Sequence, residues 1–376
     1  MSGGSESASR ITAVINRDFL SVSPLKAVAD CGVRVMAHMT GRAAMLEENR
    51  GLIATVLRRT EQLTSIPVDV VSFLVPSELE ETAMQLVAER FKLNVFGSGS
   101  VYSEQVEIYK DSSGSRVNTI LEQPQEKYRM QTQLTGICCI VVRGQGDLVS
   151  RLALETGSCV PTVTFGQGAG LRDLLGLWRI TIPAEKEVVT MVVNSFEATE
   201  IMNMLIDILK LDQSGRGFIY HFPVKRGLVN MKVSQGTRSQ AASMEQVVMA
   251  LDELKGGAEW RRRKINAGSS ETRHRQFMTG YEELALYCDE GNGEDYVKIA
   301  MAAGASGGTI SEYKHIDWGS ELGVLPAREK CSMIVSPHQT ENIITHFKDA
   351  GVLDDRTHND LIVRAVPKAF SYSAKR

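Results

Sequence analysis

Apolar residues recur along the chain in short runs that polar stretches separate, and the spacing within these runs differs. The runs at 137–142, 160–165 and 188–193 are rich in Val and Ile, which predicts strands. The stretch 197–211 instead repeats apolar residues every three or four positions, which predicts a helix. The residues on the apolar face of that helix are Ile201, Met204, Leu205, Ile208 and Leu211. With a further helix that begins at Asp147, this segment alternates strands and helices.

The first segment shows a related pattern. A strong apolar run at 68–75 predicts a strand, and Ser77 with Glu80 three residues later has the spacing of a helix capping box. The stretch 42–63 is polar and has the propensity of a helix. After a turn rich in glycine and serine, 101–109 predicts the last strand of the segment.

The third segment follows the same order. A strand is predicted at 281–287, and a helix at 295–303 is stopped by a glycine. A strand at 331–335, a helix at 340–350 and a closing strand at 361–366 complete the segment. The same order of strands and helices recurs in three segments, so we expect the whole chain to consist of repeated units.

Strand, helix, two strands, helix and strand is the ferredoxin-like (βαββαβ) order, so the sequence predicts an α+β fold of tandem ferredoxin-like units. Each unit would leave one face of its sheet bare, and three units could cover these faces around a pseudo-threefold axis within one chain. The predicted divisions are a first unit at 11–110, a polar linker at 111–133, a second unit at 134–230, a linker at 231–275 with an amphipathic helix at 244–254, and a third unit at 276–370.

Composition narrows the class of protein. The 376 residues are 43% hydrophobic and 23% charged, as in ordinary globular proteins, and a net charge of −3 gives no footprint for nucleic acid. The six cysteines and seven histidines are scattered without the spacing of metal ligands. No nucleophile elbow, Walker loop or dinucleotide fingerprint occurs in its required context, so we expect no enzyme and no metal. No apolar run reaches membrane-spanning length, and the start lacks a signal core, which indicates a cytoplasmic protein.

Two glycine-rich stretches of the second segment are candidates for anion binding. Glycines at alternate positions let successive backbone N–H groups converge on one anion, and neighbouring basic side chains add charge. The alternatives are a flexible turn for the glycines and solvated surface charge for the basic residues. The candidate ligand-binding residues are Gly166, Gln167, Gly168, Gly170, Arg172, Gly215, Arg216, Gly217, Lys225 and Arg226.

The second segment resembles the PII signalling proteins of nitrogen regulation, and more specifically their PII-like relatives. The run Ala153 to Thr164 is similar to the helix, glycine and second strand of that family. Gly166-Gln167-Gly168 falls where those proteins enter the mobile T-loop, and Gly215-Arg216-Gly217 falls at the B-loop. The resemblance implies that an adenine nucleotide (ATP, ADP or AMP) binds in a cleft between neighbouring units. Because the third segment lacks these glycines, we expect one dominant site.

We therefore predict a non-enzymatic, PII-like regulatory protein that binds a small anionic effector, with an adenine nucleotide as the possible effector and no certain cofactor. Binding would order the loop that follows Gly166 and so signal to an unidentified target protein. The alternative is a structural or adaptor protein of the same fold that has lost nucleotide binding. We expect no nucleic acid partner and no membrane span, and a monomeric pseudo-trimer, or a dimer formed through the helix at 244–254.

Overall fold

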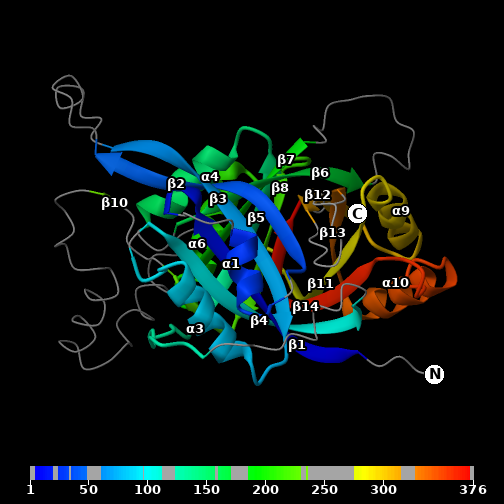
Figure 1. The fold of residues 1–376 in the computed structure, drawn as a ribbon. Coiled ribbons are helices and arrows are strands. Elements are labelled where there is room, and N and C mark those ends of the chain that lie inside the picture. Colours follow the sequence, from blue (N-terminus) through cyan, green and yellow to red (C-terminus); the bar gives the residue numbers. More distant parts are fainter. Residues whose placement is uncertain are drawn as a thin grey trace, which may run out of the picture.

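The structure is a computed structural model that describes residues 5–19, 24–33, 35–48, 61–95, 97–111, 123–156, 160–170, 185–229, 234–235, 275–314 and 327–372 (Figure 1). Several predicted features lie outside these residues. They are Arg172, the part of the predicted loop that lies beyond Gly170, and the amphipathic helix at 244–254.

Within the residues that the structure describes, the first segment contains four strands, two helices and one 3-10 turn. In chain order these are β1 (Glu6–Asn16), η1 (Arg17–Phe19), α1 (Pro24–Asp30), β2 (Ala37–Glu48), β3 (Glu61–Val75), α3 (Glu80–Arg90) and β4 (Gly99–Lys110). The helix predicted from residue 42 onward is wrong at its start, because β2 pairs with β3 along its whole length. Pairing along a neighbouring strand outweighs the weak helical propensity of polar residues.

The start of α3 also differs from the prediction. The helix begins at Glu80 and its N-cap is Leu79, which makes no side-chain capping bond. Glu80 is buried and accepts hydrogen bonds from Ser9 and Ser103. The Ser77 capping box is therefore wrong, since the Glu80 carboxylate is used for tertiary contacts instead.

The second and third segments supply the remaining elements. Those of the second are β5 (Leu134–Val142), α4 (Gly146–Glu155), β6 (Thr162–Gly170), β7 (Glu185–Asn194), α6 (Ala198–Leu209), β8 (Gly217–Val224) and β9 (Arg226–Leu228), and the short β10 (Ser234–Gln235) lies in the linker that follows. Those of the third are β11 (Met278–Asp289), α9 (Gly293–Ala302), β12 (Gly307–Lys314), β13 (Ala327–Val335), α10 (Pro337–Asp349) and β14 (Asp360–Ser371).

The strands of the described ranges join in one 14-stranded sheet. Its order is β10-β2-β3-β1-β4-β14-β11-β13-β12-β6-β7-β5-β8, and β9 pairs with β4. Additional pairings of β2 with β12, β2 with β6 and β14 with β8 connect strands that are distant in this order. The pairings are antiparallel, except that β10 lies parallel to β2. The sheet thus runs through all three segments.

The predicted fold class, an α+β chain of tandem ferredoxin-like units in a pseudo-threefold trimer, is wrong. The fold is mostly β, because β4 pairs with β14, β14 with β8, and β12 with β6, which merges the segments into one sheet. Edge strands satisfy their free backbone groups by pairing with a neighbour, and in each of these three pairings the neighbour belongs to another segment. The ferredoxin-like and PII-like assignments of the fold are therefore wrong as well.

Short helices pack on the outside of this sheet, and Figure 1 shows α9 and α10 side by side over the third segment. Each segment buries its helices in a separate apolar cluster, represented by Val87, Leu205 and Ile343. A further cluster joins segments, since Tyr102 of β4 meets Phe222 of β8 with ring centroids 6.3 Å apart. None of the helices in the described ranges has the length and apolar character needed to cross a membrane.

Candidate functional site

Three strands, one from each segment, meet at a single junction. Each of β2, β6 and β12 follows the first helix of its segment, and each pairs with the other two. One cross-strand pair from each contact shows the arrangement: Arg42 with Val163, Gln167 with Ile310, and Lys314 with His38. These pairs form a cycle, because each strand contributes one residue to its pair with each of the other two strands. The three strands therefore surround a common point.

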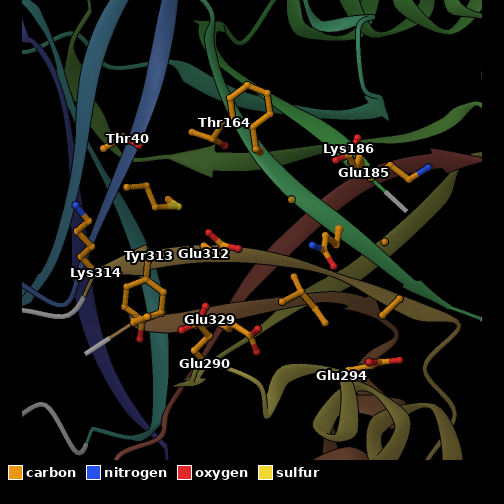
Figure 2. A pocket seen from close by; sticks show the side chains of 18 of the residues that line it. Thr40, Thr164, Glu185, Lys186, Glu290, Glu294, Glu312, Tyr313, Lys314 and Glu329 are labelled. Carbon is orange, nitrogen blue, oxygen red and sulfur yellow. The ribbon is translucent and has the colours of Figure 1, made fainter. Parts of the chain in front are cut away.

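A cavity of about 630 Å³ lies at this junction (Figure 2). This volume falls within the range of small-molecule binding sites, which is roughly 300–1,000 Å³. Figure 2 shows Thr40 and Thr164 on one side of the cavity and Glu290, Glu294 and Glu329 on the opposite side. All three segments line it, so its shape depends on how they join.

The first predicted glycine stretch lies in this cavity, but as part of a strand. Gly166, Gln167 and Gly168 line the cavity as residues of β6, and Gly170 ends that strand. The prediction of a loop at these positions is therefore wrong. A Cβ on Gly166 would lie 3.0 Å from the carbonyl oxygen of Ile310, closer than the two strands allow. The absence of side chains lets β6 pair closely with β12 on one edge and with β7 on the other.

The second predicted glycine stretch does not line the cavity, and its glycines have structural causes. Gly215 and Gly217 have φ angles of 75° and 151°, which favour glycine. A Cβ on Gly217 would lie only 2.3 Å from the carbonyl oxygen of Ile140, so glycine lets β8 begin against β5. Arg216 is exposed at this turn. The structure therefore does not bring the two glycine stretches together.

Lys225 and Arg226 join two segments. Lys225 forms an ion pair with Glu80 of α3, and Arg226 lies 3.0 Å from Glu80 and 2.9 Å from Glu81. Burial alone would raise the pKa of Glu80, but the hydrogen bonds from Lys225 and the nearby serines outweigh it and lower that pKa. Both basic side chains are therefore engaged by carboxylates of the first segment.

His38 lines the cavity and belongs to a chain of polar contacts that the sequence did not predict. Its Nε2 lies 2.6 Å from Oδ1 of Asp69, and Arg17 donates two hydrogen bonds to the same carboxylate, at 2.8 and 3.0 Å. Burial would raise the pKa of Asp69, but the hydrogen bonds from His38 and Arg17 lower it to about 2. Because an ionised carboxylate only accepts hydrogen bonds, Nε2 carries the proton that faces Asp69. A charged residue inside the apolar run 68–75 was the signal that could have indicated this contact.

Three carboxylates occupy corresponding places in the three segments, each opposite its junction strand. They are Asp69 opposite Thr40, Glu187 opposite Phe165, and Glu329 opposite Glu312. Glu187 accepts hydrogen bonds from the backbone N–H groups of Gly144, at 2.9 Å, and Gly146, at 2.6 Å. Glu329 accepts one from Gly293 at 2.8 Å. The starts of α4 and α9, where an external anion would otherwise bind, are thus occupied by the chain's own side chains.

The remaining charges of the cavity fall into paired and unpaired groups. Arg143 donates to Glu185 at 2.8 Å, and Lys298 lies 3.6 Å from Glu294. Glu290, Glu312 and Lys314 form no side-chain hydrogen bond or ion pair within the part of the chain that the structure describes. In those same ranges, no group of three or more His, Cys, Asp or Glu side chains is arranged to hold a metal ion.

Comparison with known proteins gives little further guidance. No protein-family model matches the chain, and no curated protein matches it. A search of solved structures aligns it with the crystal structure of aspartate kinase from Synechocystis, at 7% identity and a TM-score of 0.20. The alignment covers 96% of this chain and 44% of that chain, so this chain spans less than half the length of that protein. A likeness at this level carries no argument about function.

Proposed function

We propose that this chain is a non-enzymatic regulatory protein that binds a small effector in the cavity at the junction of β2, β6 and β12. The observation that carries the proposal is the convergence of the three segments on one cavity of small-molecule size. A ligand held there would contact all three segments at once. Binding would therefore stabilise the arrangement in which the strands meet, and a target protein could respond to that change.

The strand contacts at the junction support this view of regulation. β2 and β6 share two residue pairs, and β12 and β2 share one, that of Lys314 with His38. By contrast, β2 pairs with β3 from Ala37 to Glu48. β12 and β6 share four residue pairs. The contacts of β2 with the other two junction strands are therefore short, and a ligand that bridges them would add to the interactions that hold the three strands together.

An adenine nucleotide stays a prediction as the effector. Gly166, Gln167 and Gly168 line the cavity, while Lys225 and Arg226 are engaged elsewhere by carboxylates. We further propose a monomer as the functional unit, because one chain supplies all three junction strands. We propose the cytoplasm as its location, since the described cysteines are buried free thiols, as suits a reducing compartment: Cys31, Cys138, Cys139, Cys288 and Cys331.

A thermal-shift screen of the full chain tests the proposed site. The panel contains ATP, ADP, AMP, amino acids, diamines and sugar phosphates. At least one compound should raise the melting temperature of the natural protein and of Thr279→Trp, whose exposed threonine lies on β11 outside the cavity lining. The same compound should have no effect on Thr40→Trp, which fills the cavity. Phe165 occupies the corresponding place in β6, so a junction strand accepts an aromatic side chain there.

Three outcomes would contradict the proposal. A panel without any binder would favour the alternative of a structural or adaptor protein that has lost effector binding. A compound that stabilises Thr40→Trp as strongly as the natural protein would place the site elsewhere. Steady chemical conversion of the bound compound by the pure protein would show that it is an enzyme.

A further inference from the structure

The cavity presents two carboxylates that the described protein groups leave unneutralised. Glu312 comes from β12, and Glu290 precedes α9; both line the cavity and are exposed. Glu329, which lines the same side, already accepts the Gly293 N–H. Among the described residues of the lining, Lys314 is the one cation for which no partner is described. Its single positive charge balances only one of the two carboxylates, Glu290 and Glu312. The unpaired groups of the lining therefore carry an excess of negative charge.

A second, independent feature is the side chain of His38. It is 7% exposed, and its Nδ1 is buried without a hydrogen-bond partner among the described residues. Residues two apart on a strand share a face, so His38 lies on the same face of β2 as Thr40, and both line the cavity. Nε2 carries the proton that faces Asp69, so in the neutral form of the ring Nδ1 presents a lone pair and is an acceptor. A buried acceptor without a partner is costly, and a ligand that donates a hydrogen bond there removes the cost.

The apolar part of the lining limits the kind of ligand further. Met39, Phe165 and Ile310 also line the cavity. Methionine and aliphatic side chains suit a hydrocarbon chain, and the face of an aromatic ring attracts a cation. Arg143 already lies 5.9 Å from the centroid of Phe165, which shows that this ring accepts a cation on its face.

We propose that the effector is a small organic amine, which binds through protonated amino groups to Glu290 and Glu312 and places its carbon chain against Met39 and Ile310. This inference rests on the proposed function and specifies the ligand class of that same site. An ammonium group has only donors, which matches two carboxylates and the Nδ1 acceptor of His38. A phosphate has the opposite requirement, and the N–H group at the start of α9 that could receive it is held by Glu329.

Titration calorimetry of the full chain with putrescine, spermidine, lysine and ATP tests the proposal. At least one of the three amines should bind, and the double variant Glu290→Gln, Glu312→Gln should weaken that binding by about tenfold or more, because charge-assisted hydrogen bonds are lost. The control is the double variant Glu200→Gln, Glu341→Gln, which removes the same charge from exposed helix positions outside the cavity lining. It should bind the amine as the natural protein does. Circular dichroism verifies that both double variants remain folded.

The outcomes separate this inference from the proposed function. An amine that both double variants bind equally well, or that Thr40→Trp still binds, would overturn the inference, because the polycation would then associate with the general surface. If no amine binds, but ATP binds to the natural protein and not to Thr40→Trp, the proposed function stands and the amine as effector is contradicted. If neither amines nor ATP bind, and the wider panel also fails, both proposals fall.

Discussion

Arg364 of β14 donates a hydrogen bond to Glu104 of β4, and this buried ion pair joins the third segment to the first. Arg364 also donates to Glu283 of β11, while Arg10 of β1 donates to Glu104 at 2.8 Å. The guanidinium of Arg364 lies 3.9 Å from the ring centroid of Phe222 of β8. One arginine therefore contacts all three segments at the centre of the molecule.

The same network shows how the three segments correspond. In the three segments β1 pairs with β4, β5 with β8 and β11 with β14. One residue pair from each meets at this centre: Arg10 with Glu104, Gly136 with Phe222, and Glu283 with Arg364. A Cβ on Gly136 would lie 2.0 Å from the Phe222 ring, so glycine is required beside that aromatic side chain. Two segments thus supply charged pairs, and the other supplies an aromatic ring that covers the arginine.

Arg364→Met should lower the free energy of unfolding by about 3–5 kcal/mol, because it leaves Glu104 and Glu283 buried with one cation fewer. Urea denaturation measures this change. As a matched control, Arg143→Met removes an arginine from an exposed pair with Glu185 and should cost less than about 1 kcal/mol. Equal effects of the two substitutions would show that the central network contributes no more than a surface pair.

Stability should also decline in mild acid because of His221. This side chain is 7% exposed, and its burial lowers its pKa from 6.5 to about 4, to which the charge of Lys368 contributes. The unfolded state then binds a proton more readily than the folded state, so the stabilisation is present above pH 6.5 and is lost as the pH falls toward 4. At about 1.4 kcal/mol per pKa unit, the loss is of the order of 3 kcal/mol.

Denaturant unfolding at a series of pH values tests this expectation. His221→Gln keeps a donor for the carbonyl of Ala198 and should flatten the decline between pH 6.5 and 4. The matched variant His338→Gln, at an exposed position, should leave the decline intact. An unchanged slope in His221→Gln would assign the acid sensitivity to other groups.

The glycines of β6 should differ in their tolerance of a side chain. Gly166→Ala places a Cβ 2.9 Å from Oγ of Ser311 and 3.0 Å from the carbonyl oxygen of Ile310, so it should destabilise the protein by about 1–3 kcal/mol. Gly170→Ala meets its nearest atom at 3.9 Å and should have little effect. Thermal unfolding of both variants measures the difference. The close approach of β6 and β12 would be contradicted if Gly166→Ala were as stable as Gly170→Ala.

Lys225 should matter for stability and not for effector binding. Lys225→Met removes one of the two basic partners of the buried Glu80 and should destabilise the protein. Glu80→Gln should lose much of the same interaction. In a double-mutant cycle, the two substitutions together should therefore cost less than the sum of their separate effects. Effector affinity should stay unchanged in Lys225→Met; a clear loss of affinity would restore the phosphate-binding role that the sequence suggested.

Local patterns in the sequence predict elements better than they predict the sheet. The helical spacing of the apolar residues correctly predicted α6, in which Ile201 and Leu205 are buried, but Ile208 of the same predicted face is exposed. The joining of the three segments into one sheet could not be predicted from such local patterns. The pairing of Gln167 with Ile310, for example, joins edges of strands that are far apart in sequence, and no local pattern encodes which free edge meets which.

The candidate site was found in part for a similar reason. The alternating glycines marked Gly166 and Gly168 as unusual, and both line the cavity. The predicted phosphate-binding loop is nevertheless a strand, because the same glycine spacing suits close strand pairing as well as phosphate binding. His38 and Glu312 carry no signal of their own in the sequence, since their importance comes from the cavity that three distant segments create.

A crystal structure of the full chain grown with the tightest-binding compound of the thermal-shift panel tests the central claim most directly. The account predicts ligand density in the cavity among β2, β6 and β12, with a donor atom within hydrogen-bond distance of Nδ1 of His38 and contacts to residues of all three segments. Density for the ligand elsewhere on the molecule, with the cavity holding only solvent, would contradict it.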